Sequence, residues 1–284
     1  MIYFLMNPLA NNRKGDQIEN EAKDSFGGEK IEIVDLTKLS NSADFVKNLN
    51  PSDVIVIAGG DGTIFRFVNE IYGMDIQQEI YLYPNGSGND FAHDISDYVS
   101  MKNKLLPIKS FLKKLPYVEV NGIKKYFING IGFGIDGYCC EQGDIQREKE
   151  SDKPINYASI AIKGVLGKFH PSNATVTVDG VVHKFKHVWL APTMIGRFYG
   201  GGMMIAPKQD RRNSDNSVTC VILHSAIPLK VLIVFPNIFK GTHLKSKIFE
   251  SFVGHEITVE FDKPQALQID GETVKNVYSY TVKS

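Results

Sequence analysis

Four short apolar runs recur along the first 84 residues, and polar segments separate them. The run DVIVIAGG is almost continuous in apolar, mostly β-branched residues, which is typical of a parallel strand buried on both faces. The runs MIYFLMN, KIEIVDL and EIYLYP predict three further strands. The four predicted strands cover residues 1–7, 30–36, 53–60 and 79–84.

The segments between these runs have the spacing of helices. In TIFRFVNEIY the apolar side chains fall on one helical face, and they are Ile64, Phe67, Val68 and Ile71. A polar surface helix is predicted at 13–26 and a short helix at 42–49. This alternation of strands and helices predicts an open parallel α/β sheet.

The pattern changes near residue 116, where strands begin to follow one another directly. The segment ATVTVDGVVHKFKHVWLAP predicts a hairpin that turns at Asp179-Gly180. Helical spacing remains only around 145–168 and 228–240. We therefore predict an α/β domain over 1–116 and a mostly antiparallel β domain over 117–284, whose C-terminal tail could return to the first domain. The β domain continues in SVTCVILH, HEITVEF and ALQIDGETV.

Charge and cysteine content narrow the function classes. Lys+Arg and Asp+Glu both number 32, and this balance argues against nucleic-acid binding by bulk charge. No run approaches the roughly 18 apolar residues of a membrane span, and the N-terminus lacks the features of a signal peptide. The three cysteines have no CxxC spacing, so neither a disulfide framework nor a zinc site is expected. These features predict a cytoplasmic protein.

Two glycine-bearing turns carry the candidate chemistry. Gly59-Gly60-Asp61-Gly62 joins a strand to a helix, and PNGSGND follows the next strand. Ligands of open α/β sheets bind beyond the carboxyl ends of the strands, and N–H groups at a helix N-terminus accept phosphate. Asp61 would repel phosphate unless a cation such as Mg²⁺ lies between them. The alternative is a plain loop with an N-capping aspartate, and neither a Walker A nor a Rossmann motif is present.

The ordered set of motifs resembles the diacylglycerol kinase catalytic-domain superfamily of bacterial soluble lipid kinases. GGDGT at 59–63 and NGSGNDF at 85–91 carry the resemblance first. GGDGT alone is shared with NAD kinases, whereas the GGGM and LQIDGE segments are typical of the lipid kinases. The further matches are Asn7-Pro8 with Gly15, Thr37, NGIGFGIDG at 129–137, GRFYGGGMMIAP at 196–207 and LQIDGE at 267–272.

The resemblance implies an α/β nucleotide domain, a β-sandwich-like domain, and ATP in the cleft between them. Asp61 would lie near the phosphates and Mg²⁺ as a catalytic residue, and Glu272 would be the general base for a lipid hydroxyl. The two would face one another across the cleft. The implied nucleotide-binding set is Asn7, Thr37, Gly59, Gly60, Asp61, Gly62, Thr63, Ser87, Gly88, Asn89 and Asp90.

The chain departs from the family pattern at several positions. Phe65 and Arg66 stand where the family has Asn and Glu after GGDGT, and Arg66 could aid phosphate binding instead. Ser87 replaces the usual Thr. The family's structural Mg²⁺ motif is reduced to Asp215, with Thr219 in place of its second Asp. A metal there would use Asp215 and the carbonyls of Arg212 and Ser217.

The sequence therefore predicts an ATP-dependent lipid kinase, with diacylglycerol as the default substrate and phosphatidic acid as product. An NAD kinase-like enzyme and a nucleotide- or lipid-binding protein with weakened catalysis are the alternatives, and IDGET could be a simple hairpin. The protein would contact the membrane peripherally, and it could form a homodimer. The lysines around VLIVFPNIF could form a lipid-binding surface or the solvated face of a core helix, and they are Lys230, Lys240, Lys245 and Lys247.

Overall fold

The computed structural model describes residues 1–7, 30–149 and 155–284, which form two compact units. One unit comprises Met1–Leu115 and the other Pro116–Ser284. The helix expected at 13–26, with the matched Gly15, lies outside the described residues. Among the described helices, none combines the length and the apolar character needed to cross a membrane.

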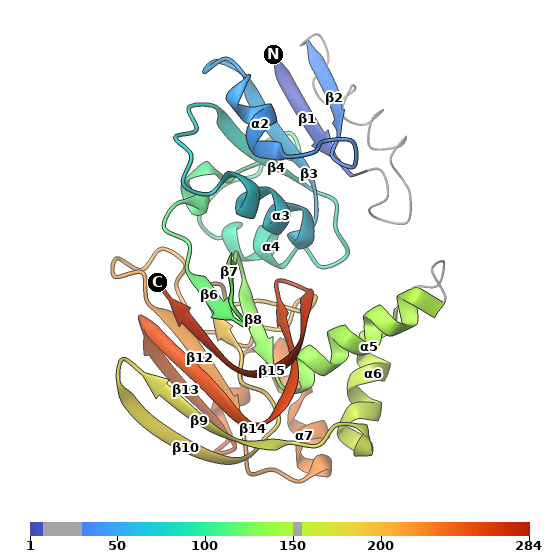
Figure 1. Cartoon of the computed structure of the whole chain (residues 1–284), viewed down its shortest axis with the longest axis vertical. Helices are drawn as coiled ribbons and strands as arrows, with labels where there is room; N and C mark the ends of the chain where they lie inside the picture. Colours follow the sequence, from blue (N-terminus) through green and yellow to red (C-terminus); the bar gives the residue numbers. More distant parts are fainter. Residues whose placement is uncertain (8–29, 150–154) are drawn as a thin grey trace. The chain divides into compact units, whose positions relative to one another are not determined.

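A five-stranded sheet forms the centre of the N-terminal unit (Figure 1). Its order is β2-β1-β3-β4-β5, with the first four strands parallel and β5 antiparallel to β4. The parallel α/β sheet predicted from the apolar runs is therefore confirmed. The strands are β1 (Ile2–Met6), β2 (Ile31–Asp35), β3 (Val54–Gly59), β4 (Glu79–Pro84) and β5 (Leu106–Pro107).

Short helices connect these strands and bury one face each. In α3 the four residues predicted to share a face are all buried, and Phe65 is buried beside them. Phe65 therefore joins the core at the position where the family has a polar amide. The helices of this unit are α2 (Ser42–Lys47), α3 (Asp61–Ile71), α4 (Asp90–Ile95) and the 3₁₀ turn η2 (Lys109–Leu112).

An antiparallel sheet builds the C-terminal unit, in the order β13-β12-β11-β8-β14-β15-β6-β7, with β9 and β10 joined to it through β14. The predicted β9–β10 hairpin is present, and Asp179 and Gly180 both have positive φ, as a two-residue type I′ turn requires. The strands are β6 (Tyr117–Val120), β7 (Ile123–Tyr126), β8 (Gly130–Phe133), β9 (Ser172–Val178), β10 (Val181–Val188), β11 (Thr193–Met194), β12 (Val218–Leu223), β13 (Phe249–Gly254), β14 (Glu256–Ile269) and β15 (Glu272–Lys283).

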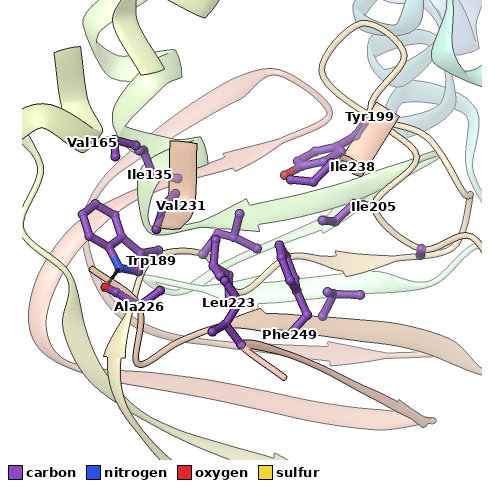
Figure 2. Packing of buried hydrophobic residues seen from close by; sticks show 14 of the residues in the cluster. Ile135, Val165, Trp189, Tyr199, Ile205, Leu223, Ala226, Val231, Ile238 and Phe249 are labelled. Atoms are coloured by element: carbon purple, nitrogen blue, oxygen red, sulfur yellow. Dashed lines mark hydrogen bonds between the residues drawn. The ribbon is translucent and has the colours of Figure 1, made fainter. Parts of the chain in front are cut away.

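Helices cover one end of this sheet and share a core with it (Figure 2). Trp189 lies in that core, and its indole N–H donates to the carbonyl of Ala226 at 2.9 Å. Val165 and Val231 pack into the same cluster from two different helical segments. The segments are α5 (Ile135–Lys149), α6 (Tyr157–Lys163), the π-helical turn η3 (Gly164–Lys168), α7 (Pro228–Val234), α8 (Pro236–Phe239) and the 3₁₀ turn η4 (His243–Lys245).

Candidate active site

The carboxyl ends of the four parallel strands place the predicted nucleotide residues on one edge of the N-terminal sheet. Met6 pairs with both Asp35 and Ala58, and Gly59 pairs with Pro84, so the strands end at nearly the same level. The chain adds β2 on one side of β1 and β3 on the other. This reversal creates a switch point, where open α/β sheets bind ligands.

The two glycine turns at this edge contact one another through their backbones. A Cβ atom added to Gly60 would lie 2.7 Å from the Cα of Gly86, and a Cβ on Gly86 would come closer still to Gly60. Cβ atoms do not occupy such distances, so both positions require glycine. The packing of the two turns therefore explains why residue 60 is glycine.

Asp61 links the two turns by hydrogen bonds. It is the first residue of α3, and its carboxylate accepts the backbone N–H of Asp90 at 3.0 Å and that of Phe91 at 2.8 Å. These N–H groups belong to the first turn of α4, where a helix has no internal acceptor for them. Asp61 is thus a capping residue, as one alternative reading held, but for the neighbouring helix, which lies beside α3 in Figure 1.

The second turn is held in shape by Asn89 and leaves Ser87 and Gly88 exposed. Asn89 has a left-handed backbone with φ 53°, and its amide both accepts from the N–H and donates to the carbonyl of Gly86, each at 2.8 Å. Gly62 is also exposed, and a Cβ there would meet no atom within 4 Å. Open space therefore lies over the first turn of α3, next to Gly62.

Arg66 points along the outer face of α3 rather than standing alone as a phosphate ligand. Its Nε lies 2.8 Å from Oε1 of Glu70, and Oε2 of Glu70 accepts the backbone N–H of Ser42 at 2.8 Å. Burial raises the pKa of Glu70, but the hydrogen bonds from Ser42 and Arg66 outweigh it and leave this pKa below its usual value. The structure thus gives Arg66 an ion-pairing role on the helix surface.

Thr37 and Asn7 complete the described residues of this edge. The backbone N–H and the hydroxyl of Thr37 both donate to Oδ1 of Asp35, at 2.9 and 2.6 Å. The hydroxyl bond is the main reason why the pKa of Asp35 is lowered. Asn7 directly follows β1 and is half-buried. Thr63 lies behind the turn, where its side chain occupies the space that a Cβ on Gly59 would need.

In the C-terminal unit, the IDGE segment is a rigid two-residue hairpin between β14 and β15. Ile269 pairs with Glu272, and Asp270 and Gly271 have φ of 45° and 95°. The Asp270 carboxylate accepts three consecutive backbone N–H groups, from residues 128 to 130, at 2.6, 2.9 and 3.1 Å. The side chain of Gln268 accepts the N–H of Gly271 at 2.7 Å. The alternative that IDGET forms a hairpin is therefore confirmed for the backbone of this segment.

Glu272 is presented by this anchored hairpin as an exposed side chain. It is the first residue of β15, and the next residue, Thr273, donates its hydroxyl to Oδ2 of Asp144 on α5 at 2.7 Å. The backbone that carries Glu272 is therefore fixed on both sides. Its carboxylate faces solvent within the C-terminal unit, which leaves it accessible to a substrate.

A buried carboxyl group, which the sequence argument did not single out, lies in the first turn of α5. Asp136 belongs to the quoted segment NGIGFGIDG, and its buried Oδ2 accepts no hydrogen bond from any described residue. Burial raises the pKa of Asp136 to about 7, and the nearby hydroxyl of Tyr199 offsets part of that rise. The signal available in the sequence was an aspartate inside an otherwise apolar, glycine-rich motif.

Two of the three residues proposed for a structural metal, Asp215 and Ser217, are joined by hydrogen bonds, whereas the N–H of Arg212 donates to Asp210. The Asp215 carboxylate accepts the hydroxyl and the N–H of Ser217, at 3.0 and 3.2 Å, and these bonds lower the pKa of Asp215. The Ser217 carbonyl, a predicted ligand, accepts amides of Gln209 and Asn213 at 2.9 and 2.8 Å. Across the described residues, no three His, Cys, Asp or Glu side chains gather as a metal site. A cation here would have to replace these hydrogen bonds, and the metal site stays a prediction.

Comparisons with known proteins agree with these two units. Residues 1–114 match the model of the diacylglycerol kinase catalytic domain, and residues 129–281, more than half of the chain, match the YegS C-terminal NAD kinase beta sandwich-like domain. The diacylglycerol kinase of Mycobacterium tuberculosis is 26% identical over 201 residues, which cover 68% of this chain and 62% of that protein. The match thus spans less than two thirds of that relative.

Two further proteins are similar over more of their length. The diacylglycerol kinase of Bacillus subtilis is 24% identical over 232 residues, which cover 79% of this chain and 72% of that protein. A crystal structure of a diacylglycerol kinase from Bacillus anthracis superimposes with a TM-score of 0.63 at 17% identity, covering 99% of this chain and 93% of that one, and it shows a common fold. With both of its units matched in order, this chain belongs to the diacylglycerol kinase family.

Proposed function

We propose that the protein transfers the γ-phosphoryl group of ATP to the hydroxyl of a membrane lipid, with diacylglycerol as substrate and phosphatidic acid as product. The observation that carries this proposal is the pair of glycine turns packed together and bridged by Asp61 at the switch point of the sheet. Family membership supports the lipid class of the acceptor. A cytoplasmic location with peripheral access to the membrane would supply both substrates.

ATP would bind over the first turn of α3, where Gly62 leaves open space. N–H groups at a helix N-terminus favour phosphate through hydrogen bonds and the helix dipole, and a side chain at position 62 would fill the approach. The exposed hydroxyl of Ser87 lies on the partner turn and would contribute a further hydrogen bond. Thr37 and Asn7, at the ends of the neighbouring strands, would contact the rest of the nucleotide.

Asp61 and Asp90 are the carboxylates of the two glycine turns, and oxygen ligands of that kind suit Mg²⁺. Bound Mg²⁺ would neutralise charge that builds up on the transferring phosphoryl group. We assign Asp61 a positioning role as well, because its carboxylate holds the first turn of α4, which begins with Asp90, against the first turn of α3. Replacing Asp61 would therefore displace the first turn of α4 from that of α3, in addition to any effect on the transfer of the phosphoryl group.

Glu272 would act as the general base on the lipid hydroxyl. As the lipid oxygen forms its bond to the γ-phosphorus, its proton would pass to the Glu272 carboxylate, while the bond to the bridging oxygen breaks and ADP leaves. A base must be held within hydrogen-bond reach of the proton it removes. The hydrogen bonds of Asp270 and Gln268 hold the hairpin backbone in place, so that Glu272 is presented in a fixed position.

The direct test offers labelled ATP to the protein with a panel of dispersed diacylglycerol, a polyprenol and a sphingoid base, and with NAD in a parallel reaction. We expect labelled phosphatidic acid. Label in NADP would support the NAD kinase-like alternative, and ATP binding without transfer to any acceptor would support the weakened-catalysis alternative.

Substitution at Glu272 tests the base. Glu272→Gln keeps the shape of the side chain but cannot accept the proton, so turnover should fall by about a hundredfold or more while ATP affinity stays near that of the parent. Glu260→Gln is the matched control, because Glu260 is an exposed glutamate on the paired strand β14. If the Glu272 variant turns over like this control, Glu272 is not the base.

A further inference from the structure

Large apolar side chains protrude from one helical end of the C-terminal unit. Leu166, in η3, is 66% exposed, and Leu229 and Ile233, in α7, are 64% and 66% exposed. η3 and α7 contact one another, and Figure 1 shows α6 and α7 at this end of the unit. We define the apolar tip as Ile162, Leu166, Ile227, Leu229 and Ile233, all of them about half exposed or more.

The backbone beneath the apolar tip is fixed by the core. Val231 of α7 is buried in the cluster that surrounds Trp189, and Val165 of η3 is buried in the same cluster. Leu229 and Ile233 stand two positions before and after Val231, which in a helix directs them to the opposite, outward face. The outward positions of a short surface helix normally carry polar side chains. Here the fold presents aliphatic side chains on a rigid support.

Lysines lie close in sequence to the apolar tip and line a pocket beside α6, and no described acidic side chain pairs with them. A pocket of about 290 Å³ between α5 and α6 is lined by Lys149, Lys163 and Lys168, together with glutamine, tyrosine and isoleucine side chains, and by no described Asp or Glu. Lys163 directly follows Ile162 in the chain, and Lys168 lies two positions after Leu166. Lys230 directly follows Leu229 on α7 and is exposed. The tip therefore lies among cationic side chains that are available to an anion.

We propose that the apolar tip inserts into the surface of an anionic lipid bilayer, and that the lysine pocket between α5 and α6 receives phosphate headgroups. Aliphatic side chains with neighbouring lysines are the combination that binds the interface of an anionic membrane. A second copy of the chain fits less well, because a two-fold interface would set this patch against itself and bring lysines against lysines. The proposal rests on the kinase function proposed above and names the surface through which that function would reach its lipid.

Vesicle co-sedimentation without nucleotide tests this surface independently of catalysis. We expect the protein to bind phosphatidylcholine vesicles that contain phosphatidylglycerol and to bind pure phosphatidylcholine vesicles far more weakly. Leu229→Ser with Ile233→Ser should weaken binding by about tenfold or more, because both side chains lose apolar area to bury. Lys163→Gln and Lys168→Gln should each weaken it by about fivefold. The control is Val181→Ser with Val182→Ser, two exposed valines of β10.

Activity on a short-chain diacylglycerol in solution separates this proposal from the kinase function. We expect the apolar-tip variants to keep that activity while losing activity on vesicles. Unchanged vesicle binding by both the apolar and the lysine variants would overturn the proposal. So would light scattering that shows a dimer of the parent and a monomer of the Leu229→Ser, Ile233→Ser variant. Failure of the kinase function alone would appear as absent turnover with intact vesicle binding.

Discussion

The buried carboxyl of Asp136 makes the stability of the C-terminal unit depend on pH in a direction opposite to that of most aspartates. The pKa of an aspartate in an unfolded chain is about 3.9, whereas burial raises that of Asp136 to about 7. The folded state therefore holds this proton more tightly than the unfolded state. Its contribution to stability is fully present below about pH 4 and is lost as the pH rises through 7.

The size of the effect follows from the shift. A rise of about three pKa units, at 1.36 kcal/mol per unit, sets an upper limit of about 4 kcal/mol. Between pH 5 and pH 8 the free energy of unfolding should fall by roughly 2–3 kcal/mol through Asp136 alone. Asp136→Asn removes the titration and keeps the shape of the side chain. Its unfolding free energy should therefore gain that amount relative to the parent over the same pH range.

Trp189 provides a selective assay, since it is the only tryptophan in the chain and lies in the same core cluster as Ile135, next to Asp136. Urea unfolding followed by its fluorescence at pH 5, 6, 7 and 8 reports on this unit. His243 is buried and has a lowered pKa, so it acts in the opposite direction, but it is present in both proteins and cancels in the difference. Parallel pH curves for parent and variant would refute the reasoning.

Three other substitutions test the turns, and a fourth tests the metal site. Gly86→Ala should destabilise the N-terminal unit by about 2 kcal/mol or more in thermal unfolding, because its Cβ meets the backbone of Gly60. Gly62→Val has open space and should fold like the parent, yet calorimetry should show weakened ATP binding, and unchanged affinity would place ATP elsewhere. Asp61→Asn should lower both kinase turnover and the stability of this unit, the latter by about 1–2 kcal/mol from the lost cap, and ordinary turnover with parental magnesium dependence would exclude its catalytic role. If Asp215→Ala melts like the parent both with and without Mg²⁺, the metal site is excluded, whereas stabilisation of the parent alone by Mg²⁺ would support it.

The sequence pattern predicted the sheet well because strand burial leaves a local signature. Continuous apolar runs such as DVIVIAGG mark a parallel strand wherever they occur, and the alternation with helical spacing set the topology class. The hairpin at Asp179-Gly180 could also be predicted from local sequence, since a turn with two positive φ values favours those residues. The two glycine turns lie together for a related reason, because parallel strands end at a common edge.

What the sequence could not supply were contacts between distant segments. Gly60 needs to be glycine because of Gly86, and this pairing is invisible without the register of β3 and β4. The partners of Asp61, 29 and 30 residues away, were hidden for the same reason. The two amides that donate to the Ser217 carbonyl, a predicted metal ligand, could not be inferred from the local sequence either. Burial of Asp136 likewise depends on the packing of the whole unit.

The cap that Asp61 places on α4 makes the first turn of one helix depend on a residue of another helix. α4 has six residues, and a helix of that length does not form alone in water, since nucleation is unfavourable and few hydrogen bonds follow. Its first turn becomes stable only when β3 and α3 have already delivered the Asp61 carboxylate. The nucleotide-binding edge is therefore complete only when two segments that are distant in sequence, at 59–63 and 84–95, have come together.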